Sequence, residues 1–284
     1  MSAALASRLP GGTGGRSPLA QVWLIVGMLV GLQYALNALV YFHVLPQFLR
    51  SKLFLLSGLL AVALSLFFAG KDGVKQLFIP YTRFASQWYW LLFALLWNFP
   101  LIMMSIPLSE MLAGAQPHFD RPHWIGWQSV LRHIGLLTAV ALCDELFWIG
   151  FVLPRLLAAG YGPLKASLAI GVFWGFSYVP LVFTQFFVSK GLTIDSLVLG
   201  WFAMAPLYIW LYHKTSSALL VIIMSVSMQL SNWTMPVLPE PPHYDNGPVA
   251  VLNLLTLLMG MLLWKFPSSA AAQSGRKIAV GIPQ

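Results

Sequence analysis

Residues 143–155 read CDELFWIGFVLPR and place two adjacent carboxylates, Asp144 and Glu145, inside an apolar segment. Asp and Glu together number only eight in 284 residues, so a neighbouring pair in such a segment needs an explanation. A charged side chain near the bilayer centre costs about 2.5–3.5 kcal/mol on insertion scales and usually faces the protein interior or a wet cavity. The pair is therefore a catalytic or binding site, or a structural pair that lies near the cytoplasmic interface or locks helices together by hydrogen bonds.

The composition excludes a soluble globular domain, because hydrophobic residues make up 58% of the chain and charged residues only 8%. We expect an all-α, polytopic transmembrane helical bundle. The single cysteine, Cys143, excludes an internal disulfide and any multi-cysteine metal site, and its apolar surroundings favour an inert thiol. The net charge of +8 arises from Lys and Arg at segment ends, as membrane topology requires, so the sequence predicts a lipid bilayer and no nucleic acid as partner.

About 20 apolar residues are needed for a helix to cross a bilayer. Eight stretches qualify as spans: residues 20–44, 53–70, 86–109, 129–157, 164–188, 193–212, 216–236 and 248–266. They form one transmembrane domain over residues 18–267. Residues 1–17 are rich in Ala, Gly, Ser and Pro and are predicted to be a disordered tail, and residues 268–284 a cytoplasmic tail.

The distribution of basic residues predicts the orientation of the bundle. With the N-terminus inside, the predicted cytoplasmic segments hold eleven Lys and Arg and the opposite segments hold five. The positive-inside rule then places both termini in the cytoplasm. We expect the bacterial inner (cytoplasmic) membrane as the location.

The fourth predicted span is too long for a straight transmembrane helix. Residues 131–157 would extend about 40 Å at 1.5 Å per residue, whereas the hydrocarbon core is roughly 30 Å thick. The helix must therefore tilt, bend or partly emerge, and Gly150 and Pro154 are the positions where a bend is expected.

The segment Asp144–Gly150 (DELFWIG) resembles the first motif of the CAAX-protease and bacteriocin-processing membrane family, which includes the type II CAAX prenyl endopeptidases. That motif is Glu-Glu, three residues, Arg and usually Gly, and Ile149 takes the place of the Arg. The second motif is an aromatic residue, three residues and His. Residues 174–178 (WGFSY) match its shape, with Tyr178 where the His would stand.

The third family motif is a His followed four residues later by Asn or Asp. Two registers fit its position in this chain: Ser225 with Gln229, or Met228 with Asn232. Neither register has a His. The resemblance covers about residues 84–235 and implies an eight-span bundle of the CAAX-prenyl-protease type.

The resemblance implies how active family members work: the Glu of the first motif activates a water, and the His and Asn residues of the other motifs stabilise the oxyanion. This chain lacks both histidines and the Arg, although the Tyr178 hydroxyl and the Asn232 amide can each donate a hydrogen bond. Removal of one oxyanion donor typically costs about 10²–10³-fold in rate. The substitutions therefore favour a non-catalytic descendant over a protease.

The leading hypothesis is a catalytically degenerate, CAAX-protease-like pseudoenzyme that acts as a binding, assembly or structural subunit of a membrane complex. It would hold a membrane partner, a lipid or a cofactor-bearing protein in a cavity around Asp144, Glu145, Tyr178 and Asn232, with Glu145 kept as a buried hydrogen-bond acceptor. The alternative is an intramembrane CAAX-type endopeptidase that acts on a membrane-bound substrate. In that case Glu145 is the general base, Asp144 assists, and Tyr178 and Asn232 replace the usual donors.

The histidines support only a weaker third hypothesis. His43, His133 and His213 lie near predicted span ends, and a lone His can be an axial ligand of haem, so a pigment- or haem-binding subunit is the third alternative. No other cofactor and no metal is predicted, because the sequence contains no zinc-binding motif. His118, Asp120 and His123 share an outer loop that could bind a metal weakly, but a solvated loop is the favoured interpretation.

Overall fold

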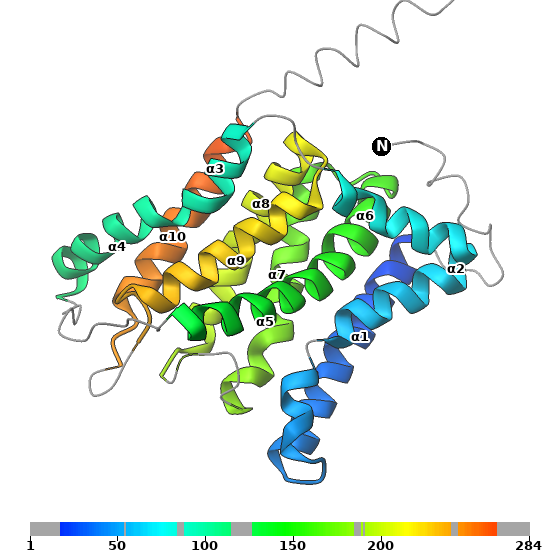
Figure 1. The fold of residues 1–284 in the computed structure, drawn as a ribbon, viewed down its shortest axis with the longest axis horizontal. Coiled ribbons are helices and arrows are strands. Elements are labelled where there is room, and N and C mark those ends of the chain that lie inside the picture. Colours follow the sequence, from blue (N-terminus) through cyan, green and yellow to red (C-terminus); the bar gives the residue numbers. More distant parts are fainter. Residues whose placement is uncertain are drawn as a thin grey trace, which may run out of the picture.

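The computed structural model describes residues 18–53, 55–83, 88–114, 127–184, 189, 191–239 and 244–265, and Figure 1 shows their arrangement. Every regular element in these ranges is a helix, which confirms the all-α transmembrane bundle. Six helical stretches are long and apolar enough to cross a membrane, and two further apolar helices are shorter. The chain is therefore an integral membrane protein. Both predicted tails lie outside the described residues.

The helices follow one another in a simple order along the chain. They are α1 (Pro18–Tyr41), η2 (Gln47–Lys52), α2 (Leu55–Thr82), α3 (Trp88–Leu96), α4 (Asn98–Ala113), α5 (Trp127–Glu145), η3 (Leu146–Val152), α6 (Leu153–Ala158), α7 (Pro163–Thr184), α8 (Ile194–Thr215), α9 (Ala218–Thr234) and α10 (Gly247–Leu263). The short helix η2 is a 3₁₀ helix and η3 is a π-helix. Helices α3 and α4 together form one apolar stretch, Trp88–Leu112.

The predicted fourth span consists of three consecutive elements, α5, η3 and α6. The π-helical segment η3 contains Gly150, and Pro154 is the second residue of α6. Of the two positions expected to allow a bend, Gly150 therefore lies within the interruption of the α-helix and Pro154 lies directly after it. Single π-helical turns within α-helices are rare and frequently occur at functional sites. Here the π-helix begins directly after Asp144 and Glu145, so the interruption adjoins the carboxylate pair.

Helix α2 has a side of small residues that lets α5 approach closely. Ser57, Gly58 and Ala61 are buried on this side. A β-carbon added to Gly58 would lie 2.9 Å from the sulfur of Cys143, so only glycine fits this contact. Small residues at helix interfaces are a common packing solution in membranes, where backbones must approach closely to gain van der Waals contact. The half-buried Cys143 thiol is thus part of the α2–α5 packing.

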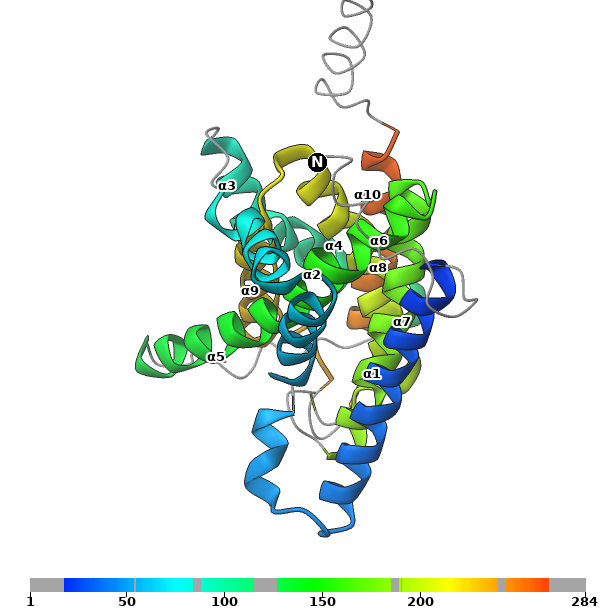
Figure 2. The ribbon, with the colours of Figure 1, turned by 90° about the vertical axis from the view of Figure 1, so that its right-hand side faces the viewer.

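Helices α7 and α8 pack closely at the centre of the bundle. Helix α8 also packs along α10, and α1 lies alongside α7 (Figure 2). Two glycines allow the α7–α8 approach: a β-carbon at Gly171 would lie 3.0 Å from the Phe202 backbone, and one at Gly175 would lie 2.8 Å from the Val198 carbonyl oxygen. This contact fixes the position of α7, which carries Trp174 and Tyr178.

We expect Gly175→Ala to lower the stability of the bundle by about 1–3 kcal/mol, because the added methyl overpacks a backbone contact that cannot yield like a flexible side chain. The measurement is the midpoint of thermal unfolding of the detergent-solubilised protein. Gly27→Ala is the matched control, since no heavy atom lies within 4 Å of its added β-carbon. Equal midpoints for the two variants would contradict the close α7–α8 contact.

Candidate functional site

Asp144 lies in the last turn of α5 and is buried, with 4% of its surface exposed. Its carboxylate accepts two hydrogen bonds from different helices. The Ser57 hydroxyl on α2 donates to Oδ1 at 3.0 Å, and the Tyr178 hydroxyl on α7 donates to Oδ2. The indole of Trp174 lies beside the same carboxylate, but its N–H is not within hydrogen-bond geometry. Through these two hydrogen bonds Asp144, on α5, links its helix to α2 and to α7.

Glu145, the next residue, is completely buried and has a different environment. Neither oxygen of its carboxyl group has a hydrogen-bond partner among the residues that the structure describes. Three tyrosines from different helices, Tyr81, Tyr178 and Tyr208, lie close enough to interact with it electrostatically. A buried polar group without a partner is rare in folded proteins and calls for an explanation. Of the two carboxylates, Glu145 is the one whose hydrogen-bonding capacity is uncommitted.

The π-helix η3 brings α2 close to Glu145. A β-carbon added to Gly150 would lie 2.7 Å from Cδ1 of Leu77, 3.5 Å from the Tyr81 hydroxyl and 3.7 Å from the Glu145 carbonyl oxygen. Glycine at this position therefore permits the approach of the last turns of α2. The Tyr81 hydroxyl is itself buried without a hydrogen-bond partner within the described part of the chain.

Tyr208 connects the carboxylates to helix α9. It is fully buried on α8, its hydroxyl contacts the Met228 sulfur at 3.8 Å, and it lies beside Ser225. Ser225 and Met228 are the first members of the two registers considered for the third family motif. The structure therefore places the α9 positions where the family has its His next to Tyr208, and Tyr208 lies near Glu145.

Asn232, the fourth predicted site residue, accepts a hydrogen bond from a residue on α4. Asn98 on α4 donates one hydrogen bond to the Asn232 side-chain oxygen at 2.8 Å and one to the Ser231 hydroxyl at 2.7 Å. These three residues form a polar cluster between α4 and α9. The described contacts include none between Asn232 and either carboxylate. A role for Asn232 at the site stays a prediction.

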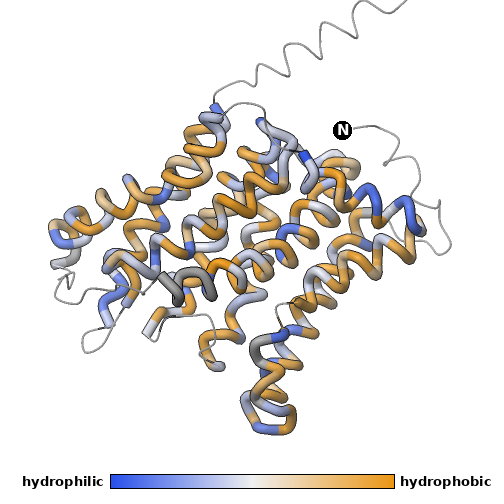
Figure 3. Tube along the Cα trace, in the orientation of Figure 1, coloured by the Kyte–Doolittle hydropathy of each residue, from blue (hydrophilic) through white to orange (hydrophobic). Residues whose placement is uncertain are grey.

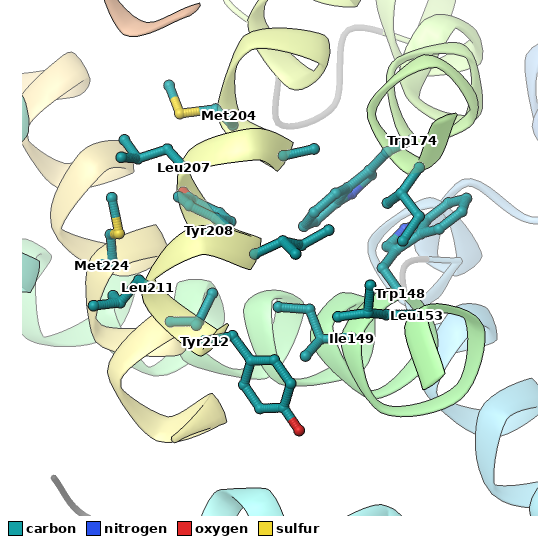
Figure 4. Packing of buried hydrophobic residues seen from close by; sticks show 14 of the residues in the cluster. Trp148, Ile149, Leu153, Trp174, Met204, Leu207, Tyr208, Leu211, Tyr212 and Met224 are labelled. Atoms are coloured by element: carbon teal, nitrogen blue, oxygen red, sulfur yellow. The ribbon is translucent and has the colours of Figure 1, made fainter. Parts of the chain in front are cut away.

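A stack of aromatic rings forms one wall beside the carboxylates. Trp174 is stacked between Trp148, at a centroid distance of 5.8 Å, and Trp201, at 4.9 Å. Trp201 in turn lies 4.3 Å from the ring of Tyr178, and Tyr208 meets Trp174 edge-on. Figure 4 shows Trp148 and Trp174 side by side, with Tyr208 in the same packed cluster. The stack holds the Tyr178 ring in place against Asp144.

The structure describes three of the histidines, His43, His133 and His213. His133 meets the ring of Trp233 at 5.2 Å, and His213 meets Trp264 at 5.8 Å. His43 follows α1 with a positive φ of 60°. Within the described ranges no group of three or more His, Cys, Asp or Glu residues could hold a metal ion. The predicted loop residues His118, Asp120 and His123 lie outside those ranges.

Comparison with known families agrees with the geometry. Residues 126–231 match the family model described as Type II CAAX prenyl endopeptidase Rce1-like. Over these residues the chain is similar to the Rce1-like CAAX-protease family. The matched region contains the carboxylate pair, Trp174, Tyr178 and Tyr208, and it ends one residue before Asn232, so the resemblance inferred from the motif shapes is confirmed. No curated protein sequence matches the chain significantly.

Three residues of this CAAX-protease-like site could not be identified from the family motifs. Ser57 and Tyr81 belong to α2, which precedes the matched region, and Tyr208 lies between the second and third motifs. Sequence periodicity does not distinguish them from ordinary buried residues of a membrane helix. An intramembrane carboxylate needs donors from other helices, but the sequence does not show which helices supply them.

We expect Glu145→Gln to leave the thermal stability unchanged or to raise it. The change removes an ionisable group that has no hydrogen-bond partner in the described structure, and it preserves the side-chain shape. Any loss in the free energy of unfolding, measured from the thermal midpoint in detergent, should be smaller than about 1 kcal/mol. A loss of several degrees would show that Glu145 has a stabilising partner and would contradict its description as uncommitted.

Proposed function

We propose that this chain is a catalytically degenerate CAAX-protease-like membrane protein that acts as a binding, assembly or structural subunit of a membrane complex. The match to the Rce1-like family model over residues 126–231, which include the carboxylate pair, supports this proposal. The substitutions at the family's His and Arg positions separate it from the active members. We further propose the bacterial inner membrane as its location, with both termini in the cytoplasm.

The hydrogen bond from Tyr178 to Asp144 is the observation that supports this proposal best. Tyr178 occupies the position of the second-motif His and is the residue that would have to replace it as an oxyanion donor. A donor acts on an oxyanion only when it points to the place where the charge develops. In this structure the Tyr178 hydroxyl is instead used to join α7 to α5. The position thus has a structural use in this chain.

Glu145 would serve the binding function. Its carboxyl oxygens can accept hydrogen bonds, and burial makes such bonds strong, because no water competes for them. A membrane partner that presents a hydrogen-bond donor would therefore gain more from Glu145 than from an exposed acceptor. We propose that the bound partner is a membrane protein segment, with the lipid bilayer as the surrounding medium.

The alternative, an intramembrane endopeptidase with Glu145 as general base, is favoured by one observation. A general base must be free to accept a proton, and Glu145 is uncommitted and adjoins a π-helix, a feature often found at functional sites. In this reading Tyr208 or Tyr81 would supply the donor that Tyr178 does not. A pigment- or haem-binding subunit that uses an interfacial His is the third, weaker proposal.

A cleavage assay separates these functions. The purified protein in lipid nanodiscs is incubated with fluorogenic membrane peptides, both prenylated and unprenylated, beside the Glu145→Gln variant. The proposed function predicts no turnover that depends on Glu145. Turnover that is lost in Glu145→Gln, with the fold preserved, would establish the endopeptidase instead. An absorption spectrum of the same preparation tests for a bound pigment or haem.

A further inference from the structure

Helix α2 contains two segments joined by a sharp break at Gly70. The backbone of Gly70 has φ 60° and ψ −153°, a conformation that is essentially restricted to glycine. Figure 1 shows that α2 changes direction near its middle, so that its second half runs back toward α6. No heavy atom lies within 4 Å of a β-carbon built at Gly70, whereas one built at Gly73 would lie 2.5 Å from the Ser65 carbonyl oxygen, so the two segments touch just beyond the break.

The second segment, Lys71–Thr82, is amphipathic. Lys71, Asp72 and Lys75 are exposed, and Figure 3 shows hydrophilic residues at this part of α2. Leu77 is the buried side chain of the segment, with 4% exposed. Charged residues on one side and an apolar anchor on the other are typical of a helix that lies in the membrane–water interface. We name this segment the cover.

The cover packs on the π-helix η3, which begins directly after Glu145. Leu77 and the Tyr81 hydroxyl both lie near the position that a β-carbon of Gly150 would take, and the Glu145 carbonyl oxygen borders the same position. Helix α2 packs on η3 more extensively than on its neighbours in sequence. Beyond Tyr81, the Ser217 hydroxyl donates a hydrogen bond to the Arg83 carbonyl oxygen and holds the end of the cover against α9.

Two side chains near this contact have polar atoms without partners. The Tyr81 hydroxyl and both Glu145 oxygens are buried and have no hydrogen-bond partner among the described residues, and the two side chains lie close enough to interact electrostatically. Burial of unpaired polar groups is costly, so the closed arrangement leaves hydrogen-bonding capacity unused. A bound group that forms hydrogen bonds with both residues would use this capacity.

We propose that the cover is a movable element hinged at Gly70, and that Tyr81 on its buried side is a binding residue of the Glu145 site. When the cover lifts, Glu145 becomes accessible from the membrane surface. The guest is a polar group that donates a hydrogen bond to Glu145 and exchanges another with Tyr81. This inference concerns access to the site, so it holds whether the site binds a partner or cleaves a substrate.

The chain allows a direct accessibility experiment, because Cys143 is its single cysteine. In a Cys143→Ala background, Glu145→Cys places one thiol under the cover. The probe is a charged, membrane-impermeant methanethiosulfonate reagent, and the rate of thiol modification is measured in lipid nanodiscs. Two changes should open the cover: Gly70→Ala, because alanine cannot adopt the hinge conformation without strain, and Leu77→Ala, because the buried anchor is lost.

Each of these changes should raise the modification rate at least roughly tenfold. Two controls match them closely. Gly27→Ala adds a methyl in open space on α1, and Gln76→Ala truncates an exposed side chain next to Leu77 on the cover. Neither control should change the rate. Rates that are unaffected by Gly70→Ala and Leu77→Ala, or are raised equally by the controls, would overturn the proposal.

A second measurement covers the case in which a variant fails to fold. Amide hydrogen exchange of the unmodified protein should show Lys71–Thr82 exchanging much faster than α7 and α8, because a hinged cover opens without unfolding the core. Exchange of the cover that is as slow as that of the two central helices would exclude a movable element.

Discussion

Trp174→Ala is expected to destabilise the bundle by about 3–5 kcal/mol, the range found when a large aromatic side chain is removed from a packed core. Trp174 is 1% exposed and lies between the rings of Trp148 and Trp201. Its removal leaves a large cavity beside Asp144 and withdraws support from the Tyr178 ring. The thermal midpoint of the solubilised protein measures the loss.

Trp88→Ala is the matched control for this change. Trp88 is also a tryptophan on an apolar helix, but it is 70% exposed on α3, so its removal creates no internal cavity. Its midpoint should stay close to that of the unmodified protein. Similar losses for Trp174→Ala and Trp88→Ala would mean that the aromatic stack does not organise the core.

Asp144→Ala is expected to cost about 2–4 kcal/mol, because the buried hydroxyls of Ser57 and Tyr178 both lose the acceptor that Asp144 provides. Since Ser57 belongs to α2 and Tyr178 to α7, the loss should appear as weaker packing of both helices on α5. The measurement is again thermal unfolding, combined with hydrogen exchange of α2 and α7.

Asp195→Ala provides the comparison for this prediction. Asp195 is exposed in the first turn of α8, where a carboxylate interacts with the helix dipole, typically worth about 0.3–1 kcal/mol. The double variant Asp144→Ala with Tyr178→Phe should lose less stability than the sum of the two single variants, since both changes remove the hydrogen bond from Tyr178 to Asp144. Strict additivity would show that the hydrogen bond contributes nothing.

The two carboxylates therefore have different environments although they are adjacent in sequence. Asp144 is engaged by two hydroxyls and contributes to helix packing, whereas Glu145 is buried with both oxygens uncommitted. The expected stabilities of the Asp144→Ala and Glu145→Gln variants follow from this difference. We therefore propose that a binding function of the site would depend on Glu145 rather than on Asp144.

Composition and motif spacing were sufficient to predict much of this structure. The low charge content and the length of the apolar stretches predicted a helical membrane bundle, because in lipid a helix satisfies its own backbone hydrogen bonds. The motif shapes at residues 144–150 and 174–178 predicted that Asp144 and Tyr178 belong to one site, and the structure joins them by a hydrogen bond.

Other parts of the site depend on tertiary packing. The break at Gly70 carries Tyr81 back to η3, and nothing in the helical periodicity of residues 55–82 indicates where the second half of α2 goes. A glycine with positive φ looks the same in sequence as a glycine within a helix. The engagement of Asn232 by Asn98 likewise depends on how α4 packs on α9, which pattern analysis of single helices does not reveal.

The most direct test of the proposed function is purification of the complex from the native membrane in a mild detergent, followed by quantitative mass spectrometry. We expect a membrane protein partner in a fixed ratio to this chain, and nearly the same ratio after Glu145→Gln, because glutamine keeps a side-chain oxygen as hydrogen-bond acceptor. A chain that purifies alone and cleaves membrane peptides in a Glu145-dependent manner would contradict the account.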